Sequence, residues 1–66
     1  MNTIDPGVTG RAVFTVAEFC HEHHISIALY YKLRKAGLGP REMAVGRRRL
    51  ISAESAAEWR HARERA

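Results

Sequence analysis

The sequence predicts a mainly α-helical domain with one small β-hairpin, in the order helix, turn, helix, hairpin, helix. Three residues of the kind that cap helix N-termini each stand just before an amphipathic stretch: Thr15, Ser26 and Ser52. A Gly-X pair, Gly46-Arg47, separates two short strand-like runs, as in a tight hairpin. The length of 66 residues suits one domain with a single modest core.

The composition points to an ordinary intracellular chain. Cys20 is the single cysteine, which excludes an intramolecular disulfide and gives no sign of an oxidising compartment. The sequence has no apolar run long enough to span a bilayer and no start like that of a signal peptide. We therefore expect a cytoplasmic protein without membrane contacts.

Positive charge is concentrated in the middle of the chain. The net charge is +4, but residues 26–51 hold seven basic residues against one acidic residue, Glu42. The segments before and after are slightly acidic and neutral, respectively. A basic face can simply keep a protein soluble, but concentration on one segment is also what a polyanion-binding surface requires.

The first residues differ from the rest in composition. Residues 1–12 contain Pro6, Gly7 and Gly10 and few large apolar groups, so we expect a flexible N-terminal arm. The folded domain is expected to occupy residues 13–66.

Two independent signals predict the start of the first helix. Thr15 and Glu18 have the spacing of a capping box, in which each side chain bonds the backbone amide of the other residue. Phe14 and Phe19 stand at the two positions of a hydrophobic staple. We expect this helix to continue to about His23.

A second helix is predicted after a turn of about three residues. Ser26 is its expected N-cap, and Ile25 and Tyr30 again occupy staple positions. Gly37 is placed to end the helix in a left-handed conformation, and Pro40 prevents a restart. Two short helices joined in this way have the spacing of a helix-turn-helix.

The hairpin and a third helix complete the domain. The hairpin is expected to pair residues 42–45 with residues 48–51, and Ser52 is expected to cap a helix over residues 53–65. One core should serve all the elements. Its expected members are Phe14, Val16, Phe19, Ile25, Tyr30, Leu33, Leu38, Val45, Ile51 and Trp59.

A cluster of possible metal ligands spans Cys20, His21, Glu22, His23 and His24. The zinc-protease pattern would need a histidine where Ile25 stands, and only His61 lies elsewhere to complete a structural zinc site. We interpret the cluster as a polar helix end that faces the helix dipole, with Cys20 packed inside as a small apolar group. No metal is expected.

The sequence also lacks the patterns of an enzyme. It has no Gly-rich phosphate loop, catalytic triad or acid/base pair, so we expect no catalytic residue and no cofactor. Tyr30 and Tyr31 could stack on the bases of a single strand, but we expect Tyr30 in the core and Tyr31 half exposed.

An ordered set of short motifs resembles a known group of proteins. The set comprises Phe14-Thr15-Val16-Ala17-Glu18, Ile25-Ser26, Tyr31-Lys32-Leu33-Arg34, Lys35-Ala36-Gly37-Leu38-Gly39-Pro40 and Val45-Gly46-Arg47-Arg48-Arg49 with Ile51-Ser52. It is similar to the winged helix-turn-helix modules of phage and mobile-element excisionases, AlpA-type regulators and MerR-type regulators. The resemblance covers about two thirds of the chain and is more specific for the fold than for the role.

The resemblance implies that the second helix enters the major groove of double-stranded DNA and that the hairpin acts as a wing. By position, the residues that face the groove are Ser26, Ala28, Leu29, Lys32 and Lys35. Tyr31 and Arg34 would flank them near phosphates, and the wing contacts would be Arg47, Arg48 and Arg49. The chain departs from many members by placing Ile27, Ala28 and Leu29 early in the helix. These side chains can touch a thymine methyl group but form no bidentate hydrogen bonds with bases, so sequence specificity should be modest or depend on DNA shape.

The branch of excisionases and AlpA-type proteins fits the length better than the MerR-type regulators, which continue into a dimerisation helix and an effector domain. The resemblance then implies a recombination directionality factor or a small transcriptional regulator of a phage or mobile element. Its partners would be double-stranded DNA, further copies bound cooperatively to DNA and a tyrosine recombinase (integrase), and its place would be at the nucleoid.

A protein-interaction module is the alternative. The basic face of the chain, or a third helix that carries Arg60, Arg63 and Arg65, could dock an acidic protein. Docking through the third helix predicts a contiguous apolar patch on the outer face and binding that does not depend on the arginines of the wing, whereas DNA binding would depend on them and on salt.

Overall fold

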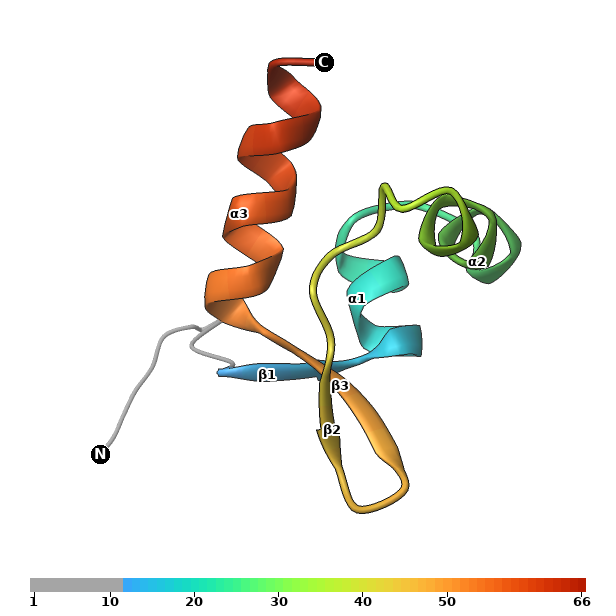
Figure 1. The fold of residues 1–66 in the computed structure, drawn as a ribbon, viewed down its shortest axis with the longest axis vertical. Coiled ribbons are helices and arrows are strands. Elements are labelled where there is room, and N and C mark those ends of the chain that lie inside the picture. Colours follow the sequence, from blue (N-terminus) through green and yellow to red (C-terminus); the bar gives the residue numbers. More distant parts are fainter. Residues whose placement is uncertain (1–11) are drawn as a thin grey trace.

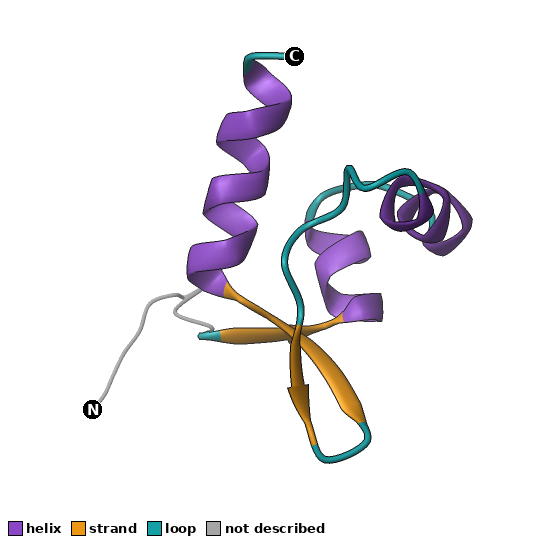
Figure 2. Ribbon diagram, in the orientation of Figure 1, coloured by secondary structure: helices purple, strands orange, loops and turns teal. Residues whose placement is uncertain are grey.

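The computed structural model describes residues 12–66, which form three helices and a three-stranded antiparallel sheet (Figures 1 and 2). The elements are β1 (Val13–Thr15), α1 (Val16–Glu22), α2 (Ile27–Lys35), β2 (Met43–Val45), β3 (Arg48–Ser52) and α3 (Ala53–Glu64). The fold is therefore mixed α/β. The sequence had predicted a mainly α domain with only a small hairpin, and this prediction was wrong because it did not include β1. No helix in residues 12–66 is long and apolar enough to cross a membrane.

The strand that the sequence prediction missed makes the hairpin part of a larger sheet. The strand order is β1-β3-β2, so β3 lies in the centre and Phe14 of β1 is opposite Ile51 of β3. The Ala53 amide also donates to the Ala12 carbonyl oxygen at 2.8 Å. Apart from Ala12, the N-terminal arm expected over residues 1–12 lies outside the described residues.

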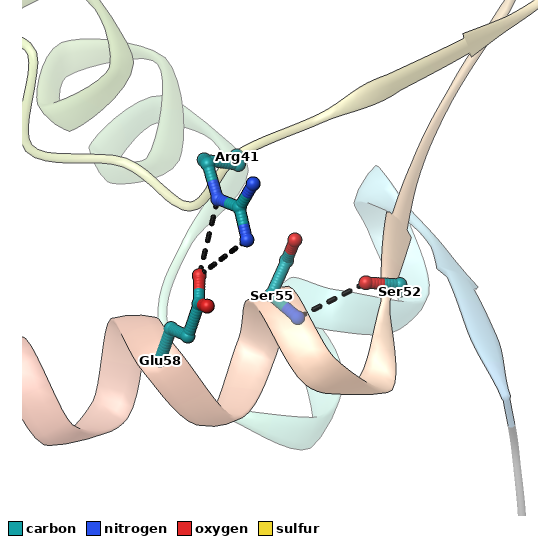
Figure 3. A network of polar contacts seen from close by, with 4 residues as sticks. All are labelled: Arg41, Ser52, Ser55 and Glu58. Atoms are coloured by element: carbon teal, nitrogen blue, oxygen red, sulfur yellow. Dashed lines mark hydrogen bonds and ion pairs between the residues drawn. The ribbon is translucent and has the colours of Figure 1, made fainter.

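All three predicted helix starts are confirmed by their capping bonds. At α1 the Glu18 amide donates to Thr15 Oγ1 at 3.1 Å and the Thr15 amide donates to Glu18 Oε1 at 2.9 Å, which completes the capping box. Ser26 Oγ accepts from the Leu29 amide at 3.0 Å at the start of α2. Ser52 caps α3 in the same way (Figure 3).

The turns have the backbone geometry that the sequence predicts, with one addition. Gly37 follows α2 with a φ of +79°, and Gly46 has a φ of +61° at the first central position of the two-residue hairpin turn. Both values lie in the left-handed region that glycine adopts without steric cost. His24, in the turn between α1 and α2, has a φ of +59°, an unusual conformation for a residue with a side chain.

Phe19 lies at the centre of the core and is fully buried. Its ring contacts Phe14 from β1, Tyr30 from α2 and Trp59 from α3, with ring centroids 6.5, 5.8 and 5.2 Å apart. The buried core of the described residues comprises Phe19, Cys20, Tyr30, Ile51 and Ala56, with Phe14, Val16, Ile25 and Trp59 packed against it. One aromatic side chain thus joins the sheet to all three helices.

Two expected core residues are exposed. Val45 is 52% exposed; it pairs with Arg48 next to the hairpin turn, beyond the part of β3 that pairs with β1. Leu38 is 43% exposed, and its carbonyl oxygen accepts from Trp59 Nε1 at 2.8 Å.

We expect Phe19→Ala to leave the chain largely unfolded at 25 °C. Removing a buried phenylalanine ring costs about 3–5 kcal/mol, which is comparable with the whole stability that a core of this size supplies. Urea unfolding followed by far-ultraviolet circular dichroism measures the loss. Val45→Ala is the control, since its side chain is half exposed, and a Phe19→Ala midpoint close to that of the control would contradict the central role of Phe19.

Candidate nucleic-acid interface

The two faces of α2 differ sharply in burial. Tyr30 is buried and Leu33 is half buried, so they mark the side that packs on the core. At 3.6 residues per turn, Ala28, Lys32 and Lys35 lie on the opposite side, and all three are exposed. The structure therefore brings three of the predicted groove-facing residues together on one outward ridge.

Apolar side chains flank this ridge on both sides. Ile27 and Tyr31 lie one helical turn apart on one flank and are 50% and 48% exposed, and Leu29 on the other flank is 40% exposed. The predicted half exposure of Tyr31 is confirmed. Ser26, also predicted to face the groove, stands at the helix start with its hydroxyl bonded to the Leu29 amide.

Glu42 sets the orientation of α2 against the loop that follows it. The Tyr30 hydroxyl donates to Glu42 Oε2, and Arg34 Nε lies 3.2 Å from the same oxygen. The Glu42 side chain is only 9% exposed, and the Arg34 guanidinium also lies over the Tyr31 ring. Arg34, predicted as a phosphate contact, is thus engaged within the protein.

A second ion pair ties the same loop to α3. Arg41 donates to Glu58 Oε1 at 3.1 Å through Nε and at 2.7 Å through Nη2 (Figure 3). The loop and α3 line a cleft of about 230 Å³, and Arg63 Nε, one of its lining groups, is buried without a hydrogen-bond partner within residues 12–66. Because both partners of the Arg41 pair are well exposed, the pair contributes little stability. It nevertheless occupies one of the seven cations of residues 26–51, the basic segment of the chain.

The hairpin presents its arginines at a projecting tip. Arg47 lies in the turn and Arg48 and Arg49 follow on β3, and all three are exposed. In Figure 1 the tip extends away from the helices, and both α2 and the tip lie to the right of α3. Successive residues of a strand point to opposite faces, so Arg48 and Arg49 offer positive charge on both sides of the hairpin.

Five cations of the basic segment have no ion pair within residues 12–66: Lys32, Lys35, Arg47, Arg48 and Arg49. All five were predicted as contacts from the sequence. Glu42 was missed as an organising residue, although it is the lone acid in a basic segment, which is a signal for a specific pairing. Ile27 was not among the predicted contacts, yet half of its surface is exposed beside them.

One member of the histidine cluster, His23, packs against the core. His23 stacks on Phe19, with ring centroids 4.1 Å apart. Its Nδ1 lies 2.8 Å from the Phe19 carbonyl oxygen and its Nε2 lies 2.9 Å from Arg60 Nη1. A carbonyl only accepts and a guanidinium only donates, so these contacts fit a neutral ring protonated at Nδ1.

Burial raises the pKa of the Cys20 thiol, and no group of three or more metal-ligating side chains is found in the described part of the chain.

The Tyr30 phenol should make the protein less stable in alkali. Burial and the hydrogen bond to Glu42 raise the pKa of Tyr30 well above its ordinary value, so the folded state keeps a proton that the unfolded state loses above about pH 10. This contribution to the free energy of unfolding is therefore complete below that pH and declines above it. Urea midpoints measured from neutral to alkaline pH should show a smaller alkaline decline in Tyr30→Phe. Tyr31→Phe is the control, and equal declines in Tyr30→Phe and the unmutated protein would contradict this assignment.

Three comparisons with known proteins gave no match for this chain. No protein-family profile, no curated protein and no solved structure matches it. What the surface binds is therefore inferred from its own residues, charges and geometry.

Proposed function

We propose that the chain binds double-stranded DNA as a winged helix-turn-helix module, with α2 in the major groove and the β2–β3 hairpin as the wing. One observation carries the proposal. The cations of the basic segment that lack an ion pair in residues 12–66 occupy only the outer ridge of α2 and the hairpin tip, whereas Arg34 and Arg41 are paired with carboxylates. The unpaired positive charge of residues 26–51 thus lies on two projecting elements, α2 and the hairpin tip.

Both elements suit the shape of duplex DNA. The major groove admits one α-helix, and the small Ala28 side chain in the outer ridge of α2 lets the helix backbone approach the base edges. The backbone amides at the start of α2, next to Ser26, favour a phosphate. Arginines at a hairpin tip can reach the backbone or a narrow minor groove, whose negative potential attracts them.

The role we propose is that of an excisionase-like directionality factor or a small transcriptional regulator. A module of this size contacts DNA over roughly 600–1,000 Å², so a single copy should bind weakly. Cooperative binding of several copies to adjacent sites would supply the remaining affinity. In Figure 1 α3 lies away from α2 and the hairpin tip, which leaves it accessible to a recombinase on the same DNA.

Titration of random-sequence duplex DNA at two salt concentrations tests the proposal. We expect binding that weakens steeply with salt, since each neutralised phosphate adds about 0.9 to the slope of log K against log salt. Arg47→Ala/Arg48→Ala/Arg49→Ala should lower the affinity on all sequences and flatten the slope by about three. Lys32→Ala/Lys35→Ala should flatten it by about two.

The matched control is Arg60→Ala/Arg65→Ala, which removes as many positive charges as the lysine variant, but from exposed positions on α3 and at its C-cap. It should keep most of the affinity. Equal losses in both double variants would show that net charge, rather than this surface, governs binding. Absence of binding at low salt would overturn the proposal and favour an acidic protein as the partner.

A further inference from the structure

The outward side of α2 carries more apolar surface than phosphate binding requires. Ile27, Leu29 and Tyr31 are each at least 40% exposed, although the whole described chain buries only five residues in its core. In the first turn of α2 the exposed residues are Ile27, Ala28 and Leu29, and none of them can donate or accept a hydrogen bond through its side chain. A surface of this kind can read a base only through an apolar group.

The major groove offers one such group, the methyl group on C5 of thymine. Cytosine that is methylated at C5 presents a methyl group at the same edge of its base pair. Guanine, adenine and unmethylated cytosine present only hydrogen-bonding groups and C–H edges there. The side chains of the first turn of α2 therefore match 5-methylpyrimidines and no other base.

The geometry of α2 allows more than one methyl group to be covered. Ala28 lies at the middle of the outer face, and Ile27 and Leu29 project to either side of it at 100° per residue. The small central side chain lets the two larger ones straddle the floor of the groove. Lys32 lies one turn further on, where its ammonium group would approach the DNA backbone. Unlike an arginine, it has no rigid fork of N–H donors with which to bind a base.

The hairpin favours the same base composition on independent grounds. The exposed Arg47, Arg48 and Arg49 at its tip suit a narrow minor groove, which is a property of A·T-rich tracts. Thymine methyl groups lie in the major groove of the same tracts. Both projecting elements therefore point to one class of site.

We propose that α2 reads the C5 methyl groups of pyrimidines through Ile27, Ala28 and Leu29, so that the chain prefers thymine-rich duplexes and duplexes that contain 5-methylcytosine. The inference rests on the proposed DNA binding and adds its specificity. Burial of one methyl group is worth about fourfold in affinity, so a site that places two methyl groups against α2 is preferred by more than tenfold.

The test replaces every thymine of an A·T-rich duplex by uracil, which removes the methyl groups and keeps the base pairing. We expect the Kd for the uracil duplex to exceed that for the thymine duplex by at least about fourfold. In a second pair of duplexes, 5-methylcytosine replaces cytosine in a G·C-rich sequence, and the methylated duplex should bind more tightly.

Ile27→Ala/Leu29→Ala should bring the ratio of the two Kd values close to one. The ratio is informative even if this variant is partly unfolded, because a smaller active fraction changes both Kd values by the same factor. Met43→Ala/Val45→Ala is the matched control. It removes two exposed apolar side chains from the hairpin and should leave the ratio unchanged.

Three outcomes of these titrations distinguish methyl reading by α2 from DNA binding as such. Salt-dependent binding with equal Kd values for thymine and uracil duplexes would overturn methyl reading and leave DNA binding intact. A ratio that persists in Ile27→Ala/Leu29→Ala would assign the preference to DNA shape instead of α2. Failure to bind any duplex would remove the inference together with the proposed function.

Discussion

The burial of the Phe19 ring is the interaction on which the rest of the molecule depends. Small domains bury a limited fraction of their surface, and here one ring supplies contacts to β1, α2 and α3 at once. Its edge-to-face contacts with Phe14, Tyr30 and Trp59 have the geometry that aromatic pairs favour. The positions of α2 and of the sheet, and hence of every proposed contact, follow from this packing.

Glu42 then decides which cations remain available. It is the single carboxylate of the basic segment and is nearly buried beside Tyr30 and Arg34. A buried carboxylate is costly unless it is paired, and here both partners contact its Oε2 atom. The pairing fixes the rotation of α2 about its axis, because Tyr30 and Arg34 are held on the side of Glu42 while Lys32 and Lys35 are left outside. Glu42, which is not itself among the proposed contacts, thereby shapes the proposed binding surface.

Features fixed by neighbouring residues could be predicted from the sequence, and those fixed by distant pairing could not. The caps at Thr15, Ser26 and Ser52 and the left-handed Gly37 are local, and each is confirmed. β1 was missed because three residues become a strand only by pairing with β3, which lies more than thirty positions away. The Glu42 pairing was missed for a related reason, since its partners are eight and twelve positions away on another element. The five cations without an ion pair in residues 12–66 had been proposed as contacts together with Arg34, and the structure shows that Arg34 differs from them in its pairing with Glu42.

The exposed apolar residues of α2 suit either of the two proposed occupants of this surface, duplex DNA or an acidic protein. An acidic protein would neutralise the lysines and arginines, and a protein interface is commonly apolar at its centre with a charged rim. Single exposed apolar residues are common on protein surfaces, whereas here Ile27, Leu29 and Tyr31 share one short helix with two unpaired lysines. The first turn of α2 is apolar, with the small Ala28 between Ile27 and Leu29, and Lys32 and Lys35 follow in the later turns. In the proposed complex this face would meet a groove that has charged walls and thymine methyl groups on its floor. In that complex specificity would be limited to the positions of the methyl groups, and the arginine hairpin would extend the preference through the width of the minor groove.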